Sequence, residues 1–217
     1  MPNPSFGLIA EGPTDHEVLT NILIGHFDDP DLTVRPLQPL LDSTDASQQQ
    51  GGWTQVINYC KSSLFQGAFE QNDYLVVQID TDRLNEKPFE LDLKLPTANL
   101  VNQVIEKIES MIEASFEVGF WGNYREKILF AVAVDELECW LLPLFYRDEN
   151  AKAVNNCLHK LNKQLRSNKQ TAINPQAKNR RYYEQLSRPF CKPRVLKSAA
   201  LKNPSLGIFV QALPAPL

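Results

Sequence analysis

Hydrophobic residues along the chain fall into two kinds of pattern. Short, nearly continuous apolar runs that end in polar or turn-forming residues are typical of strands buried on both faces of a sheet. Longer segments repeat apolar positions every three or four residues, as helices with one buried face do. The predicted strands span residues 5–12, 32–41, 74–83 and 127–135. The predicted helices span residues 13–27, 53–65 and 98–116, and a further helix starts in residues 136–146.

This alternation predicts an α/β fold with a mainly parallel sheet and helices on both faces. Strand 32–41 is expected at an edge of the sheet, because Pro36 and Pro39 cannot donate ladder hydrogen bonds. Helix 13–27 is expected to begin with a capping box formed by Thr14 and Glu17. A polar loop, residues 42–52, precedes the second helix.

Composition limits the class of protein. A chain of 217 residues that is 43% hydrophobic can bury a core as one domain with an appendage. No apolar run approaches the roughly 18 residues of a membrane span, and the N-terminus does not resemble a secretory signal. Four scattered cysteines without a C-x-x-C pair argue against a zinc site. We therefore expect a cytoplasmic protein in a reducing compartment.

Charge is distributed unevenly along the chain. Residues 1–140 contain 8 Lys and Arg against 23 Asp and Glu, whereas residues 141–217 contain 14 against 3. We therefore predict an α/β domain over residues 1–148 and a basic, mainly helical extension over residues 149–217 that packs on it. Such a basic part is suited to a polyanion such as nucleic acid, to an acidic partner, or to the acidic body of the same chain.

Acidic side chains follow three of the predicted strands. In open α/β sheets the carboxyl ends of the strands gather at one edge, where ligands bind. Unpaired carboxylates at one place would repel one another, and hard oxygen ligands suit Mg²⁺ or Mn²⁺. The sequence therefore predicts a divalent-metal site at this edge. The acids concerned are Glu11, Asp80, Asp82, Asp135, Glu136 and Glu138.

Two of these segments resemble a known signature. The run LIAEGPTDHEVL, with an E-G motif after the first strand, and the run LVVQIDTDR, with a D-x-D motif after the third, resemble the Toprim domain of topoisomerases, primases and OLD-type nucleases. The later run AVAVDELECWLL is similar to the E-x-E-x-W element of small OLD-nuclease-like proteins that lack the ATPase. The resemblance covers residues 5 to about 145. It implies a Toprim-like or Rossmann-like sheet.

The resemblance also implies roles for the acids. Glu11, Asp80 and Asp82 would bind a divalent metal and take part in catalysis, and Glu11 could instead act as the general acid or base. Glu138, with Glu136, would complete a second metal position, and Glu138 would also take part in catalysis. Gly12 would keep the turn tight, so that a phosphate could approach backbone N–H groups.

These roles imply phosphodiester hydrolysis, in which two metals would activate water and steady the leaving oxygen. Because the acidic site cannot attract DNA or RNA unaided, the basic extension is expected to do so. Tyr182 and Tyr183 are expected to stack on unpaired bases. The residues expected to contact phosphates are Arg180, Arg181, Arg188, Lys192 and Arg194.

The partners follow from the same resemblance. The chain has no P-loop motif, so any ATPase would come from another chain. Relatives of this subgroup act beside ABC-type or AAA ATPases in anti-phage defence, which implies an effector nuclease. The alternative is a non-catalytic nucleic-acid-binding or regulatory subunit of an ATPase complex. The sequence leaves open whether DNA or RNA is the substrate and whether the chain forms homo-oligomers.

Overall fold

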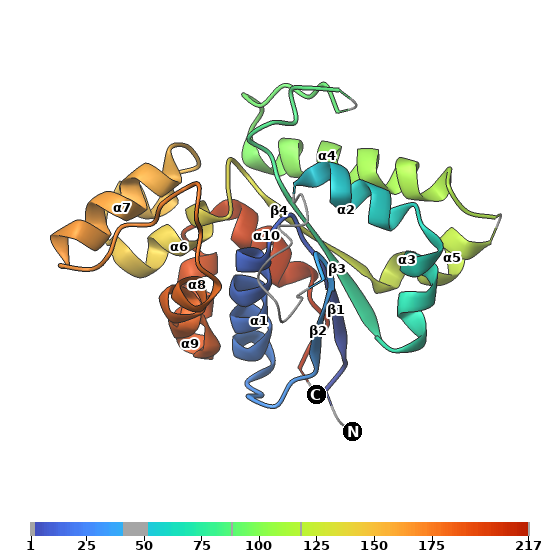
Figure 1. The fold of residues 1–217 in the computed structure, drawn as a ribbon, viewed down its shortest axis with the longest axis horizontal. Coiled ribbons are helices and arrows are strands. Elements are labelled where there is room, and N and C mark those ends of the chain that lie inside the picture. Colours follow the sequence, from blue (N-terminus) through green and yellow to red (C-terminus); the bar gives the residue numbers. More distant parts are fainter. Residues whose placement is uncertain (1–2, 41–51, 88, 118, 217) are drawn as a thin grey trace.

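Four parallel strands form the centre of the molecule (Figure 1). The computed structural model describes residues 3–40, 52–87, 89–117 and 119–216, so the predicted polar loop lies outside the described residues apart from Gly52. Within them the strand order is β2-β1-β3-β4, and each neighbouring pair is parallel. The strands are β1 (Phe6–Ile9), β2 (Val34–Gln38), β3 (Tyr74–Asp80) and β4 (Ile128–Ala133). The predicted α/β class with a parallel sheet is confirmed.

Strand β2 lies at the edge of the sheet, as its prolines predicted. Leu8 of β1 lies opposite Pro36, but the next residue, Ile9, lies opposite Gln38, so the register shifts beside the proline. The strand is also only partly buried, in contrast to β1 and β4, which are buried throughout. A continuous apolar run thus marks a buried strand, including β4 at the other edge, and the interrupted run marks the partly exposed edge strand β2.

One face of the sheet packs on helices from both ends of the sequence (Figure 1). Leu8, Val76 and Ala131 of the strands share one hydrophobic cluster with residues as late as Leu213. Trp140 stacks on Phe209 with ring centroids 5.5 Å apart. The elements of this side are α1 (Pro13–Phe27), α6 (Glu138–Phe145), η3 (Glu149–Lys152), α7 (Cys157–Ser167), α8 (Arg180–Ser187), η4 (Arg188–Cys191), α9 (Pro193–Ala200) and α10 (Pro204–Ala212).

Helix α1 approaches the C-terminal segment backbone to backbone. A Cβ atom on Gly25 would lie 1.8 Å from the carbonyl oxygen of Phe190 in η4, so only glycine fits there. Helix α10 contacts β4 and α4 (Thr97–Glu113), which places the apolar C-terminal helix against the body. The C-terminal elements therefore share a core with the sheet.

The second face of the sheet carries a separate hydrophobic cluster. The predicted helix 53–65 is wrong in one respect, because it consists of two helices. Ser62 adopts an extended conformation, and its hydroxyl donates to the carbonyl oxygen of Tyr59 at 2.7 Å, which ends the first helix. The elements of this side are α2 (Trp53–Cys60), α3 (Ser63–Gly67), η1 (Ala68–Glu70), α4 (Thr97–Glu113), α5 (Phe120–Tyr124) and η2 (Arg125–Lys127). No helix among the described residues is both long and apolar enough to cross a membrane.

The start of α1 differs from the predicted capping box. Because Pro13 takes the first helical position, Gly12 is the N-cap and Asp15 is the third helical residue. The Asp15 Oδ2 atom accepts a hydrogen bond from the Gly12 N–H at 2.8 Å. Glu17 instead pairs with Arg180. The predicted Thr14–Glu17 box is therefore wrong, because the N-cap and the third helical residue each lie two residues earlier.

Candidate metal and phosphodiester site

The ends of β1 and β3 meet through a direct hydrogen bond. Glu11 lies two residues beyond β1, and its Oε1 atom accepts from the backbone N–H of Asp80, the last residue of β3, at 2.7 Å. Parallel strands place these two ends at the same edge of the sheet. The structure therefore brings together two acids that are far apart in the sequence.

A buried glutamine holds both of these residues. Gln78 is fully buried on β3; its Oε1 atom accepts from the Glu11 N–H at 3.0 Å, and its Nε2 atom donates to Asp80 Oδ1 at 2.8 Å. The sequence analysis missed this role. The available signal was a polar residue inside an apolar strand, two positions before Asp80 and therefore on the same face. Gln78 fixes the spacing between the two strand ends.

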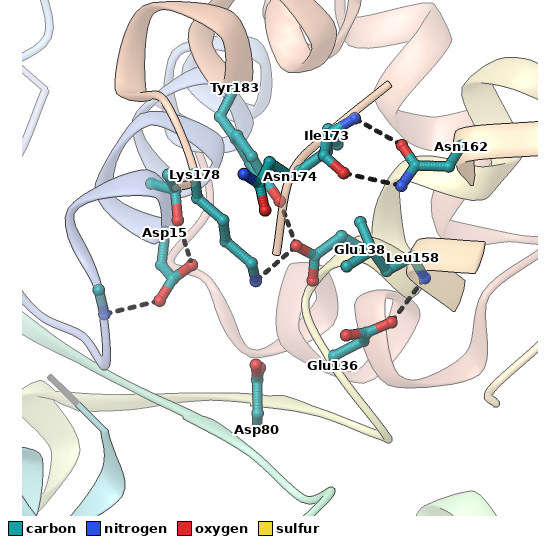
Figure 2. Close-up of polar contacts among 12 residues, drawn as sticks. Asp15, Asp80, Glu136, Glu138, Leu158, Asn162, Ile173, Asn174, Lys178 and Tyr183 are labelled. Atoms are coloured by element: carbon teal, nitrogen blue, oxygen red, sulfur yellow. Dashed lines mark hydrogen bonds and ion pairs between the residues drawn. The ribbon is translucent and has the colours of Figure 1, made fainter. Parts of the chain in front are cut away.

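Glu138 enters the site from the first turn of α6 and is only 1% exposed. Its Oε1 atom accepts a hydrogen bond from the Tyr183 hydroxyl and lies 2.6 Å from the Lys178 Nζ atom (Figure 2). Its Oε2 atom has no hydrogen-bond partner among the described residues. Half of this buried carboxylate is therefore free to bind a further group.

Lys178 lies among the acids rather than on the basic surface. Figure 2 shows its ammonium group between Asp15 and Glu138, with Asp80 facing it from the end of β3. Asp15 is buried in the first turn of α1, where its Oδ1 atom also accepts from the Thr14 hydroxyl at 3.2 Å. The sequence analysis missed Lys178 and Tyr183 as members of the site. We use the name acid cluster for Glu11, Asp15, Asp80 and Glu138.

The other predicted acids lie around this cluster. Asp82 is exposed, and its N–H donates to the Asp135 carbonyl oxygen at 3.0 Å, which continues the pairing of β3 and β4 beyond the strands. Glu136 is partly buried, and its Oε1 atom accepts from the Leu158 N–H in the first turn of α7 at 2.5 Å. Neither side chain has a direct polar contact with Asp80 or Glu138 in the described residues.

Burial makes these carboxyl groups weak acids. Desolvation, with further contributions from Asp15 and Asp82, raises the pKa of Glu11 to about 8. Desolvation and the charge of Glu11 raise the pKa of Asp80 well above its usual value. Desolvation likewise raises the pKa of Asp15 to about 6 and that of Glu136 to about 7. The cluster therefore binds protons tightly unless a cation is present.

Lys178 supplies one such cation. Burial acts to lower the pKa of Lys178, but Glu138, Asp15 and Asp80 outweigh it and raise that pKa. In return, the ammonium group acts to lower the pKa of Asp15 and Asp80. One positive charge faces four carboxyl groups, so Lys178 cannot neutralise the whole cluster.

The side chains present fit a hard divalent ion in their chemistry. The donors are carboxylate oxygens, which Mg²⁺ and Mn²⁺ prefer, and the Glu138 Oε2 atom is buried without a partner. No three carboxylates of the acid cluster, however, have oxygen atoms within 4.8 Å of one another. In the described part of the chain, one set of three candidate ligands has its ligand atoms within 4.8 Å of one another, and it is Asp135, Cys139 and Cys157.

Those two cysteines are joined in a disulfide, so they offer no thiolate ligands. The bond links α6 to the start of α7, directly after Glu138 and directly before Leu158. The expectation of a reducing compartment did not anticipate this disulfide, and its two cysteines, separated by 18 residues, show no recognisable spacing in the sequence. The disulfide fixes the backbone next to two of the predicted acids.

The predicted contacts of Gly12 and of two basic-segment residues are made within the chain. The Gly12 N–H donates to Asp15, so it is not free to approach a phosphate in this arrangement. Arg180 is paired with Glu17, with its Nε atom 2.9 Å from Glu17 Oε1. Tyr183 is 1% exposed and cannot stack on a base, which makes that expectation wrong.

The remaining basic candidates are exposed on α8, η4 and α9. None of them lies within 4.0 Å of an acidic oxygen in the residues that the structure describes. Their charges are therefore available to a ligand. We call them the basic group, and they are Arg181, Arg188, Lys192 and Arg194.

Comparison with known proteins gives no independent assignment. No protein-family model matches the chain, and neither a curated protein nor a solved structure is significantly similar to it.

Proposed function

We propose that this chain is a divalent-metal-dependent nuclease that hydrolyses phosphodiester bonds in DNA or RNA. The observation that carries the proposal is the convergence of Glu11, Asp80 and Glu138 from three separate elements at one edge of the sheet. Buried carboxylates at such a place are costly to the folded state unless a cation neutralises them. A divalent ion that catalyses hydrolysis would neutralise these carboxylates, and its role in catalysis would explain why they lie together.

Asp80 and Glu138 would hold Mg²⁺ or Mn²⁺, with Glu11 beside them and with Asp82 and Glu136 at the rim. A bound ion would polarise a phosphoryl oxygen and lower the pKa of a water molecule. Glu11, whose pKa is raised to about 8, holds a proton near neutral pH and is suited to donate it as a general acid. Gln78 would keep Glu11 and Asp80 at a fixed spacing through its two hydrogen bonds.

The basic group would attract the polyanion that the acid cluster repels. Its four positive charges are exposed on the elements that follow Lys178 in the sequence. Contacts from arginine and lysine to phosphates give affinity without base specificity. Little sequence preference is therefore expected. The family resemblance further supports a separate ABC-type or AAA ATPase as partner, in cytoplasmic anti-phage defence.

The second candidate function is a non-catalytic nucleic-acid-binding or regulatory subunit of an ATPase complex. The observation that favours it is the position of Lys178, whose ammonium group already neutralises part of the acid cluster. A protein that only binds nucleic acid would need the basic group but no metal.

Cleavage of supercoiled plasmid and of tRNA in the presence of Mg²⁺ separates the two functions. We expect nicking or cleavage by the wild type, loss of it in Asp80→Asn, and wild-type cleavage in Asp31→Asn, which changes an exposed carboxylate remote from the cluster. Binding of both nucleic acids without cleavage by any of the three proteins would refute the nuclease and support the binding subunit.

A further inference from the structure

Among the described residues, Lys178 forms one ion pair with the acid cluster, and its ammonium group also lies 5.8 Å from the centre of the Tyr183 ring. Its Nζ atom lies 2.6 Å from Glu138 Oε1, and its charge acts on Asp15 and Asp80 from the same position. The Lys178 side chain remains 31% exposed, whereas Glu138 is 1% exposed. The carboxylate is thus fixed in the core, while the cation reaches it from the surface.

The segment that carries Lys178 is held at its two ends. Residues 168–179 contain neither helix nor strand. At one end, Asn162 bonds both the N–H and the carbonyl oxygen of Ile173, at 2.6 and 2.9 Å (Figure 2). At the other end α8 begins at Arg180, which pairs with Glu17.

Between these anchors, residues 174–178 are exposed, and their backbone hydrogen bonds are local to Asn174. Such a stretch opens at little cost compared with a packed element. Lys178 can therefore leave the cluster without unfolding α7 or α8.

A divalent cation and the Lys178 ammonium group compete for the same oxygens. The Glu138 Oε2 atom is buried without a partner, beside the Oε1 atom that Lys178 occupies. A doubly charged ion bound there would lie within a few ångströms of the ammonium group, and like charges at that distance in a partly buried site repel strongly. Both cations cannot hold Glu138 at once without mutual destabilisation.

We propose that Lys178 is a built-in counter-ion of the acid cluster, which a divalent cation displaces together with residues 174–178. This inference rests on the proposed function, since it takes the acid cluster as the metal site. Lys178 stabilises the metal-free protein and weakens metal binding. When the metal binds, Lys178 moves away and exposes the acid cluster beside the start of α8, the helix that carries Arg181 of the basic group.

Mn²⁺ binding by isothermal titration calorimetry tests this directly, because it needs no activity. We expect Lys178→Gln to bind Mn²⁺ about tenfold more tightly than the wild type, in the usual range of coupling between two sites. Lys178→Arg keeps the charge and is expected to bind as the wild type does. Lys163→Gln, which removes an exposed positive charge on α7 outside the basic group, serves as the matched control and is expected to leave Mn²⁺ binding unchanged.

Hydrogen exchange of the wild type provides a second measurement that needs no variant. The amides of Asn174, Gln176, Ala177 and Lys178 are expected to exchange faster when Mn²⁺ is added, while those of α7 remain protected. Unchanged or weaker Mn²⁺ binding by Lys178→Gln, or slower exchange of residues 174–178 with Mn²⁺, would overturn the proposal. Absence of Mn²⁺ binding to every variant would overturn it too.

The same experiments separate this inference from the proposed function. If Mn²⁺ binds with the expected difference between the variants but no nucleic acid is cleaved, the nuclease is refuted and the counter-ion stands. If cleavage is Asp80-dependent but Lys178→Gln binds Mn²⁺ as the wild type does, the nuclease stands and the counter-ion is refuted.

Discussion

Replacement of Glu11 by glutamine should remove part of the pH dependence of the free energy of unfolding. Burial raises the pKa of Glu11 from 4.5 to about 8, so between these values the folded protein holds a proton that the unfolded chain releases. Raising the pH through this window therefore destabilises the metal-free wild type. Glutamine can still accept the hydrogen bond from the Asp80 N–H through its side-chain oxygen, but it does not titrate.

The size of the effect follows from the width of the window. Each pH unit between the two pKa values changes the free energy of unfolding by about 1.4 kcal/mol per proton. From about pH 5.5 to about pH 7.5, the wild type should therefore lose about 3 kcal/mol relative to Glu11→Gln. For a chain of this length, that difference corresponds to a shift of about 6–12 °C in Tm.

Urea denaturation in the presence of EDTA, at several pH values across this range, measures the difference. The exposed Glu113→Gln exchange on α4 is the matched control and should follow the wild type at every pH. Mg²⁺ should remove most of the wild-type loss, because a bound cation takes over the neutralisation of the cluster. A stability difference between wild type and Glu11→Gln that stays constant with pH would refute the reasoning.

Three further predictions concern the packing of Gly25, the hydrogen bond from Tyr183 to Glu138, and the basic group. Gly25→Ala would place its Cβ atom 1.8 Å from the Phe190 carbonyl oxygen and should cost about 3 kcal/mol in urea denaturation, whereas Gly122→Ala, with nothing within 4 Å of the added atom, should cost nothing. Tyr183→Phe should cost about 1–3 kcal/mol because Glu138 Oε1 loses a donor, and a double-mutant cycle with Glu138→Gln should show coupling; additive losses would contradict this contact. Neutralising all four members of the basic group should reduce the steepness of log affinity for duplex DNA against log salt by about 3.6 in fluorescence anisotropy, whereas Lys107→Gln on α4 should leave it unchanged; an unaltered slope would argue against phosphate contacts.

The sheet and its acidic edge were predictable because they follow from local patterns. Apolar runs mark the buried strands, and a parallel arrangement brings Glu11 and Asp80 to the same edge whatever the details of the connections. Helix α4 was equally clear, because its buried residues repeat at helical spacing from Leu100 to Ile112. Where one face of a helix or strand is buried along its whole length, apolar residues recur at the spacing of that element, so several positions predict it independently.

The missing members of the site arise from contacts across long sequence distances. Tyr183 reaches Glu138 over 45 residues, from a different helix, and Lys178 reaches it from a segment without regular structure. In the sequence both residues belong to a basic, tyrosine-containing stretch, whose local character suggests nucleic acid instead. Only the packing of α8 on α1 shows that this stretch turns toward the acids.

The predictions for the start of α1 and for the cysteines failed for a related reason. A T-x-x-E pattern forms a capping box only if its threonine is the N-cap, and Pro13 at the first helical position moves the N-cap to Gly12, two residues earlier. The disulfide between Cys139 and Cys157 depends on α6 and α7 lying side by side, which no spacing motif reveals. In both cases a single neighbouring residue or helix decides the outcome.

The central claim is that the acid cluster holds a divalent cation. Anomalous diffraction from a crystal soaked in Mn²⁺, recorded on the manganese edge, tests it most directly. We predict a peak beside Asp80 and Glu138, with Lys178 moved away from Glu138. A crystal in which Lys178 still pairs with Glu138 and no manganese lies beside Asp80 would contradict the claim.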